Sequence, residues 1–468
     1  MKIYNTLSRE VEEFIPREDG KVRMYTCGPT VYHYAHIGNL RTYIFEDILE
    51  KSLRHLGYDV TRCMNITDVG HLTSDSDSGE DKMLKGAKRE HKTVMEIADF
   101  YTEAFKSDCD KLNIHWPEIV SKATDNIEFY IKIIEKLLKD GYAYVSGGNV
   151  YFDTSKLDDY YKLTNHKIDE MVIGVREGVE EDNFKKNQAD FVLWFTKSKF
   201  QDQELKWDSP WGVGYPGWHI ECSGISIRNL GEYLDIHCGG VDNIFPHHTN
   251  EIAQSEAYLG HKWCNYWVHG EHLNDSTGKM SKSKGEFLTI SLLEEKGYNP
   301  LAYRYLCLNS SYRKVVSFSY DILDGASREY KKLKSRAMSL IKDGNIDNSK
   351  FEIYDNKFKE CLSNDLNTSM ALTVVYDVLK DNDLNDMTKR SLIESFDKVL
   401  SLDLLKEEES SVDSELENYI NDMISKRNEY KKNKEYDKAD QIREELKNKG
   451  ILIKDTREGT VYEFVENN

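Results

Sequence analysis

The spacing of apolar and polar positions near the N-terminus predicts alternating strands and helices. Short apolar runs at 22–26 and 58–67 are typical of buried strands, whereas residues 40–56 repeat apolar positions with a helical period. A strand–helix–strand unit of this length favours parallel pairing with a right-handed crossover. Both patterns return later, so we expect an α/β protein with further helices at 93–112, 125–139 and 250–259 and further strands at 234–238 and 265–270.

A different pattern interrupts this alternation in the middle of the α/β region. The runs 142–145 and 149–153 flank Ser146–Gly148, which is a hairpin signature, and 191–195 is another apolar strand. We therefore predict an insertion over about 115–205.

From about residue 320 the pattern changes again, to charged helices with apolar stripes. This change predicts a separate helical domain, followed by a charged linker at 406–413, a last helical segment and a short strand at 451–454. The expected domains are 1–318, 319–405 and 414–468, with helices of the second at 325–342, 351–363, 369–380 and 388–402.

Composition narrows the class of protein. The chain of 468 residues has a net charge of −19, which argues against nucleic-acid binding through bulk charge alone. No apolar run approaches the ~20 residues of a membrane span and the N-terminus has no signal-peptide pattern, so we expect a cytoplasmic protein. The eight cysteines form no CxxC pair and are expected to be mostly reduced, buried thiols. The polar stretch 72–92 is predicted to be a loop.

The segment Cys27–Asn39 joins the first predicted strand to the first predicted helix. A glycine-bearing turn of this kind presents backbone N–H groups and a helix N-terminus to a phosphate. Gly38 allows close approach of a nucleotide, and His36 and Asn39 can donate hydrogen bonds to a triphosphate. The short H-x-G pattern alone is weak, because an ordinary helix start explains it equally well.

A second candidate phosphate-binding segment is Lys279–Ser283, in a polar stretch over 271–287 that is predicted to be a loop. Its lysines and serines suit a phosphate clamp, although a solvated charge cluster has the same composition. The segment lies far from His36 in sequence, so the fold would have to bring the two together.

A metal site is suggested by His247 and Glu251. If a helix begins near Pro246, the two side chains lie on one face of it, four residues apart. Zinc usually takes four ligands and accepts thiolates readily, and Cys27 and Cys222 each lie at or near the end of a predicted strand. For any single cysteine the alternative is a small buried hydrophobic residue.

Taken together, these segments resemble a known family. His36–Asn39 and Lys279–Ser283 resemble the HIGH and KMSKS signatures of class I aminoacyl-tRNA synthetases. Cys27–Tyr32, Gly217–Cys222 and Phe245–Ser255 resemble the cysteinyl-tRNA synthetase family among them. The similarity extends into the tail, through 438–443 and 450–456, in the family's order. The resemblance implies a Rossmann-type catalytic domain with an insertion, a helical-bundle domain and a small C-terminal anticodon-binding domain.

The resemblance implies a ligase that activates L-cysteine with ATP and transfers it to the 3′ end of tRNA(Cys). One Zn²⁺ per chain would select the substrate thiolate, because shape alone rejects the nearly isosteric serine poorly. Trp218 would wall the amino-acid pocket beside Cys27. The implied zinc ligands are Cys27, Cys222, His247 and Glu251.

The resemblance also implies roles toward ATP. His36, Asn39, Lys279 and Lys282 would stabilise the charge that develops at the phosphates, with Mg²⁺ assisting. Gly239, Gly240 and Asp242 would hold the adenosine, together with Gly38 of the first turn.

The tail is expected to contact tRNA, and the chain is expected to be monomeric. Residues 427–457 carry more Lys and Arg than Asp and Glu, and Tyr430, Tyr436 and Arg443 could stack on or contact unpaired bases. The chain departs from the family pattern at Asn39, where His is usual, at Ser311, where His is common, and at Tyr462, where Trp is frequent.

Three other functions compete with this interpretation. A related ligase could join cysteine to an amine such as an amino-sugar, but the helical domain and basic tail disfavour it. A zinc hydrolase built on His247 and Glu251 lacks the H-E-x-x-H order and leaves Lys279 unexplained. A non-catalytic RNA-binding paralogue would not need both signatures and four candidate ligands.

Overall fold

The chain forms two compact units, Met1–Leu405 and Lys406–Asn468. The computed structural model describes residues 1–69, 93–164, 183–197, 205–275, 278–279, 287–407, 413–432, 435–456 and 459–464. The helical region from 319 to 405 falls within the first unit, and its division from 1–318 stays a prediction. Most of the predicted loop 72–92 lies outside the described residues.

A five-stranded, fully parallel sheet forms the centre of the first unit and confirms the predicted α/β fold. The chain runs outward from β3 through β4 to β5 and later adds β10 and β11 on the other side of β3. The order therefore reverses between β3 and β10, which is where open α/β sheets bind ligands. The strands are β11 (Cys264–Gly270), β10 (Leu234–Gly240), β3 (Lys21–Thr26), β4 (Asp59–Ile66) and β5 (Ile119–Lys122), in spatial order.

The position of β5 differs from the expectation that residues 115–205 form an insertion. Residues 119–122 pair in parallel with β4, as in Cys63 with Ile119, and so form an edge strand of the main sheet. The strand has only four residues and all are half-buried, so its apolar pattern is too weak to mark it in the sequence. A separate antiparallel sheet has the order β6 (Ala143–Ser146), β7 (Asn149–Phe152), β8 (Phe191–Phe195) and β9 (Tyr215–Pro216), and its first three strands lie within the predicted insertion.

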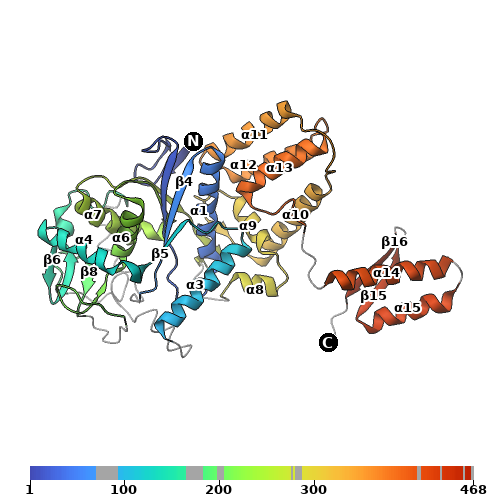
Figure 1. Cartoon of the computed structure of the whole chain (residues 1–468), viewed down its shortest axis with the longest axis horizontal. Helices are drawn as coiled ribbons and strands as arrows, with labels where there is room; N and C mark the ends of the chain where they lie inside the picture. Colours follow the sequence, from blue (N-terminus) through green and yellow to red (C-terminus); the bar gives the residue numbers. More distant parts are fainter. Residues whose placement is uncertain are drawn as a thin grey trace. The chain divides into compact units, whose positions relative to one another are not determined.

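Helices cover both faces of the parallel sheet. In Figure 1, α4 (Ile127–Lys139), α6 (Trp218–Leu230) and α7 (Thr249–Leu259) lie on one side of β4 and β5, and α1 (Ile37–His55) lies on the other. Alternate residues of β3 follow this division, because Met24 packs in the cluster with Leu49 of α1 and Tyr25 packs with α4 and α6.

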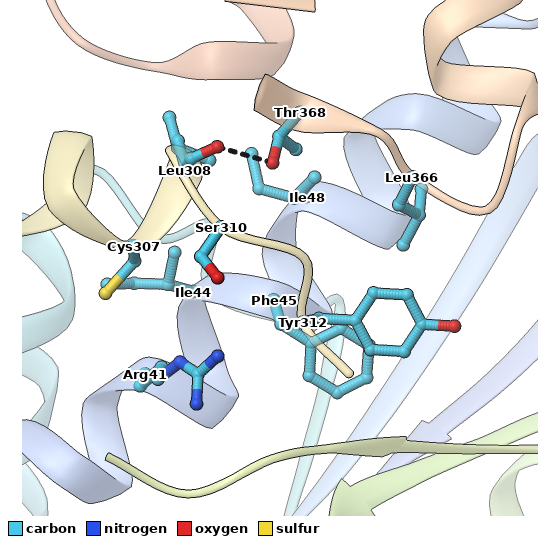
Figure 2. Close-up of a pocket in the computed structure, with 10 residues that line it drawn as sticks. All are labelled: Arg41, Ile44, Phe45, Ile48, Cys307, Leu308, Ser310, Tyr312, Leu366 and Thr368. Atoms are coloured by element: carbon cyan, nitrogen blue, oxygen red, sulfur yellow. Dashed lines mark hydrogen bonds between the residues drawn. The ribbon is translucent and has the colours of Figure 1, made fainter. Parts of the chain in front are cut away.

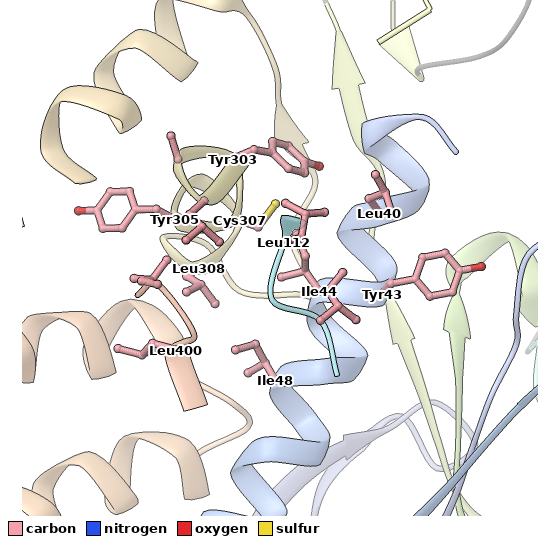
Figure 3. Close-up of a cluster of buried hydrophobic side chains, with 14 of the residues drawn as sticks. Leu40, Tyr43, Ile44, Ile48, Leu112, Tyr303, Tyr305, Cys307, Leu308 and Leu400 are labelled. Carbon is pink, nitrogen blue, oxygen red and sulfur yellow. The ribbon is translucent and has the colours of Figure 1, made fainter. Parts of the chain in front are cut away.

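Helix α1 is buried on its outer side as well. Figure 3 shows Leu40, Ile44 and Ile48 facing side chains of α9 (Pro300–Leu308) and Leu400. Each fully buried aliphatic side chain contributes about 2 kcal/mol, so this layer fixes the helical region on α1. The helical region confirms the predicted pattern and consists of α10 (Tyr320–Met338), α11 (Asn348–Ser363), α12 (Thr368–Lys380) and α13 (Asp386–Leu400).

A small three-stranded sheet replaces part of the predicted loop over 271–287. Strand β12 (Leu273–Asp275) pairs antiparallel with β13 (Gly278–Lys279) and parallel with β14 (Val316–Ser317). The sequence pattern misses it because each strand is very short and the β12–β14 pairing joins distant segments. The described part of this unit also contains β1 (Lys2–Asn5), β2 (Glu10–Glu13), α3 (Val94–Lys111) and α8 (Ile290–Glu295), besides short 3-10 helices.

The second unit contains α14 (Asp413–Lys432), α15 (Tyr436–Asn448) and a hairpin of β15 (Ile451–Thr456) and β16 (Gly459–Phe464). Its core is a cluster of Ile420, Ile442, Leu446, Ile451 and Ile453. Across the part of the chain that the structure describes, every helix is too short or too polar to cross a membrane.

Candidate metal and nucleotide site

The candidate site lies where the strand order reverses. Cys27 directly follows β3, and Gly239 and Gly240 are the last residues of β10. The turn after β3 crosses so close to β4 that a Cβ at Gly28 would lie 1.6 Å from the carbonyl oxygen of Asn65. Only glycine fits there, and the backbone N–H of Gly28 donates to Asn65 Oδ1 at 2.7 Å.

Four predicted ligands converge beside this turn. Cys27, Cys222, His247 and Glu251 each offer one ligand atom within 4.8 Å of all the others. The Sγ atoms of Cys27 and Cys222 are 3.9 Å apart, and His247 Nε2 is 3.4 Å from Cys222 Sγ and 3.0 Å from Glu251 Oε1. That oxygen of Glu251 is buried and makes no hydrogen bond of acceptable geometry. The donor set therefore fits a metal ion.

Two helix starts place three of these ligands. Cys222 lies at the fifth position of α6, which begins after Gly217. The helix predicted from Pro246 begins at Thr249, after a wider turn over Ile244–His248 in which Phe245 is extended. The i,i+4 spacing nevertheless brings His247 and Glu251 together, as predicted.

The charges of the four groups differ. Burial, and then the adjacent Cys222, raise the pKa of the Cys27 thiol well above its ordinary value. Burial also disfavours the Cys222 thiolate, but the Cys27 thiol and the His247 charge outweigh it and lower the pKa of Cys222. Burial is likewise outweighed at His247, where Glu251 and Cys222 raise the pKa to about 10. Burial thus opposes the charged form of each of these three groups, and the neighbouring groups outweigh it at Cys222 and His247 but not at Cys27.

Histidines that sequence reasoning did not select surround these ligands. His237 Nε2 lies 2.9 Å from Glu251 Oε2, and His248 Nε2 lies 3.3 Å from Cys27 Sγ. Cys27, His237, His248 and Glu251 form a second set whose ligand atoms all lie within 4.8 Å of one another. Burial and His237 lower the pKa of His248 well below its ordinary value, and lower that of His269 to about 3.

The sequence held only a faint signal for these histidines. His248 is adjacent to His247, but His237 and His269 lie inside strand patterns, where a histidine looks like an ordinary buried residue. They become neighbours because β10 and β11 are parallel partners, with Gly239 opposite His269.

The turn that begins α1 holds the residues that were predicted to contact a nucleotide. His36 is the N-cap of α1, and its Nδ1 accepts a hydrogen bond from the backbone N–H of Asn39 at 3.1 Å. A Cβ at Gly38 would lie 3.0 Å from the His36 ring, so this ring and the backbone are in close contact. The Asn39 residue is exposed at the helix N-terminus.

The other predicted residues fall at three places. Asp242 Oδ1 lies 3.5 Å from His272 Nε2, next to the end of β10. The Trp218 ring lies 4.6 Å from the His247 ring, which places it beside the metal ligands. Lys279 ends β13, and its side chain lies outside the described residues, as do Lys282 and Ser283. The roles predicted for these residues stay predictions.

Comparison with known proteins places this chain in a family. Residues 13–328 match the family model described as tRNA synthetases class I (C) catalytic domain. The cysteine–tRNA ligase of Treponema denticola is 45% identical, over 97% of this chain and 98% of the relative. That of Borrelia hermsii is 44% identical over 98% of each chain, and that of Treponema pallidum strain Nichols is 38% identical over 99% of this chain and 100% of the relative.

Solved structures show the same fold at low identity. Methionyl-tRNA synthetase of Mycobacterium tuberculosis, in complex with methionyl-adenylate, matches with a TM-score of 0.55 at 15% identity, covering 82% of this chain and 90% of that chain. The Agrobacterium radiobacter LeuRS in its ternary complex matches with a TM-score of 0.56 at 10% identity, covering 85% and 86%. From the family model and the full-length relatives it follows that the chain belongs to the cysteine–tRNA ligase family of class I aminoacyl-tRNA synthetases.

Proposed function

We propose that this chain is a cysteine–tRNA ligase that forms cysteinyl-adenylate from L-cysteine and ATP and then esterifies the 3′ end of tRNA(Cys). The observation that carries the proposal is the convergence of Cys27, Cys222, His247 and Glu251 beside the His36 turn, at the point where the strand order reverses. Identity of 38–45% to cysteine–tRNA ligases over nearly the whole chain supports the same reaction.

The four converging residues would hold one Zn²⁺. Two sulfurs, an imidazole nitrogen and a carboxylate oxygen are a donor set that zinc accepts, and the polar neighbour of the buried Glu251 Oε1 at 3.0 Å is His247, itself one of the four. When bound, zinc supplies a preference for the thiolate of cysteine over the hydroxyl of serine. Trp218, packed on His247, would close the pocket around the short substrate side chain.

Activation needs no general base, because the attacking group is already a carboxylate. It attacks the α-phosphorus of ATP, and pyrophosphate leaves. The hydrogen bond that His36 Nδ1 accepts from Asn39 favours the neutral tautomer with its proton on Nε2, so the ring can donate to a phosphate oxygen. Asn39 and the N–H groups at the start of α1 add donors at the same place.

Residues at the end of β10 and two lysines would make further contacts to ATP. Gly239 and Gly240 end β10 without bulky side chains, and Asp242 follows them, which suits an adenosine lying along the strand end. Lys279 and Lys282 would bind the departing phosphates, with Mg²⁺ assisting. A lysine fits this role because its compact charge opposes the charge of the transition state.

The second unit would contact tRNA. Tyr436 is 59% exposed and Arg443 is exposed, so both are available to unpaired bases. Tyr430 is half-buried, with Lys438 Nζ 5.2 Å from its ring centroid. We further expect a monomer that acts in the cytoplasm.

Cysteine-dependent ATP–pyrophosphate exchange tests the first step, with serine as the control amino acid. We expect exchange with cysteine and little with serine, followed by charging of tRNA(Cys). Absence of exchange would refute the proposal. Exchange without charging would favour a ligase that joins cysteine to another amine.

A further inference from the structure

Arg41 lies on α1 two residues after Asn39 and is only 4% exposed. Its Nη1 donates to the carbonyl oxygens of Glu271 and His272, both at 2.5 Å. Its Nη2 donates to those of Lys314 at 2.5 Å and Ser311 at 3.4 Å. All four acceptors are backbone atoms, and they belong to two segments that are distant in sequence. A planar guanidinium can bridge two such segments, whereas a single ammonium cannot match its fixed fork.

Both segments lead into the sheet that carries Lys279. Glu271 and His272 connect β11 to β12, where Asn274 pairs with Lys279 of β13. Ser311–Lys314 leads into β14, where Val316 pairs with Leu273 of β12. Arg41 therefore ties the two chain entries of this small sheet to the helix that begins at the His36 turn.

A cavity lies beside Arg41, next to the contacts between α1 and the Ser311–Lys314 segment. Figure 2 shows Arg41 beside a cavity bounded by α1, α9 and Ser310–Tyr312. The Ser311–Lys314 segment contacts α1 through Arg41 and through the ring of Tyr312, which stacks on Phe45 at 4.9 Å. The other segment held by Arg41 reaches the end of β10, because His272 Nε2 lies 3.5 Å from Asp242 Oδ1.

We propose that Arg41 is a positioning residue for adenylate formation, which sets the distance between the His36–Asn39 turn and the strand that carries Lys279. The inference rests on the proposed role of Lys279 at the phosphates. Arg41 itself is turned toward backbone carbonyls and has no need to touch substrate. Misplacing a charge-stabilising group by about 1 Å can cost about a hundredfold in rate, so loss of the bridge should appear in the chemical step.

A double-mutant cycle tests the inference, with the kcat of pyrophosphate exchange at saturating cysteine and ATP as the readout. We expect Arg41→Lys to lower kcat by about 10- to 100-fold and to leave the KM for cysteine within about twofold. In the Lys279→Ala background, the same substitution should lower kcat by less than about threefold, because the group that Arg41 positions is already absent.

Arg304→Lys is the matched control. Arg304 is also a fully buried arginine that donates to backbone carbonyls, those of Leu400 and Leu112, but these do not lead to Lys279. Its effect on kcat should be the same factor in both backgrounds. If Arg41→Lys does not yield folded protein, as judged by tryptophan fluorescence, Arg41→Gln enters the same cycle, since its amide can still donate to one segment.

Equal fold-losses for Arg41→Lys in the two backgrounds would overturn the inference and leave Arg41 a purely structural residue. An unchanged kcat for Lys279→Ala alone would also overturn it. Failure of the proposed function is visible separately, because the unmodified chain would then show no cysteine-dependent exchange.

Discussion

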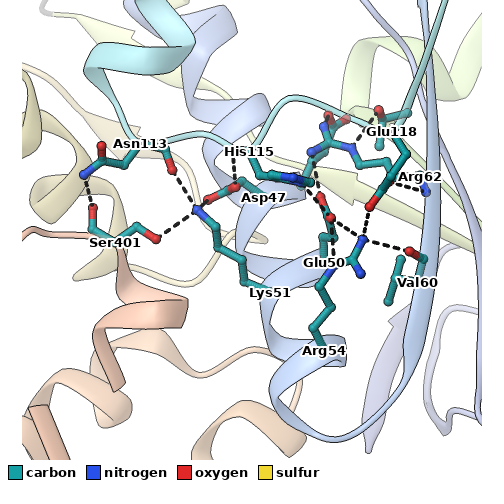
Figure 4. A network of polar contacts seen from close by, with 12 residues as sticks. Asp47, Glu50, Lys51, Arg54, Val60, Arg62, Asn113, His115, Glu118 and Ser401 are labelled. Carbon is teal, nitrogen blue, oxygen red and sulfur yellow. Dashed lines mark hydrogen bonds and ion pairs between the residues drawn. The ribbon is translucent and has the colours of Figure 1, made fainter. Parts of the chain in front are cut away.

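Replacing Asp47 by alanine should destabilise the first unit by about 3 kcal/mol. Asp47 is fully buried on α1. Its Oδ2 accepts from Arg304 Nη2 at 2.6 Å and Lys51 Nζ at 2.8 Å, and its Oδ1 accepts from the backbone N–H of His115 at 2.7 Å. Figure 4 shows how Lys51 extends this network to Asn113 and to Ser401, just beyond the end of α13. The carboxylate thus neutralises two cations where the helical region meets α1.

The magnitude follows from what the substitution leaves behind. Removing one partner of a buried ion pair costs about 3–5 kcal/mol, because an uncompensated charge remains buried. Both cations keep other acceptors, namely the Leu400 carbonyl for Arg304 and the Asn113 carbonyl for Lys51, so we expect the lower end of that range. Asp47→Asn keeps the shape and one acceptor oxygen, and should cost less than alanine.

Urea unfolding followed by tryptophan fluorescence measures the effect. All seven tryptophans lie in the first unit, so the signal is independent of the second. The midpoint should fall by the lost free energy divided by the m-value, with m unchanged. Asp99→Ala is the control, because Asp99 forms an exposed pair with Lys122 at 2.7 Å and should cost less than about 1 kcal/mol. A loss for Asp47→Ala no larger than that of the control would refute the reasoning.

The pH dependence of stability provides a second check on the role of the Asp47 carboxylate. Burial by itself raises the pKa of Asp47, but Arg304 and Lys51 outweigh it and hold the pKa below its ordinary value. Such a group stabilises the fold above its unfolded-state pKa, near 4, and loses that contribution as the pH falls through the folded-state pKa. The stability difference between the unmodified chain and Asp47→Asn should therefore shrink below about pH 4.

Three further predictions concern the site and the pH dependence. Cys222→Ser should lower bound zinc, measured by elemental analysis, and raise the KM for cysteine, whereas Cys361→Ser on α11 should change neither; unchanged zinc in the first variant would contradict the ligand assignment. Lys282→Ala should slow adenylate formation, measured in a single turnover, far more than it weakens cysteine binding, and equal effects would count against a transition-state role. Burial raises the pKa of Asp108 to about 7, so its ionisation costs stability progressively as the pH rises from about 4 to 7. At pH 8, Asp108→Asn should therefore have a free energy of unfolding in urea up to about 4 kcal/mol higher than that of the unmodified chain, and this gain should disappear near pH 4. A variant that is less stable than the unmodified chain at pH 8 would show that the carboxylate is paired.

Periodicity was sufficient for the long elements. Helices α1, α3 and α13 and strands β4 and β10 lie close to where the pattern predicts them, because an amphipathic or fully buried element repeats its apolar positions over many residues. The sequence pattern did not predict the short strands β5, β12 and β13, since a strand of two to four residues has too few positions to show a period.

By itself the sequence therefore determined the fold class, the family resemblance and the four candidate metal ligands. Spacing along the chain could pair His247 with Glu251, because residues four apart lie on one side of a helix or of the turn that leads into it. Only the tertiary structure decided which other residues lie beside these two side chains. The reversal of strand order brings Cys27 and His248 within 3.3 Å, and the parallel pairing of β10 with β11 adds His237 and His269. It also decided that Arg41 bridges Glu271 and Lys314, since backbone carbonyls are present at every residue and leave no mark in the sequence.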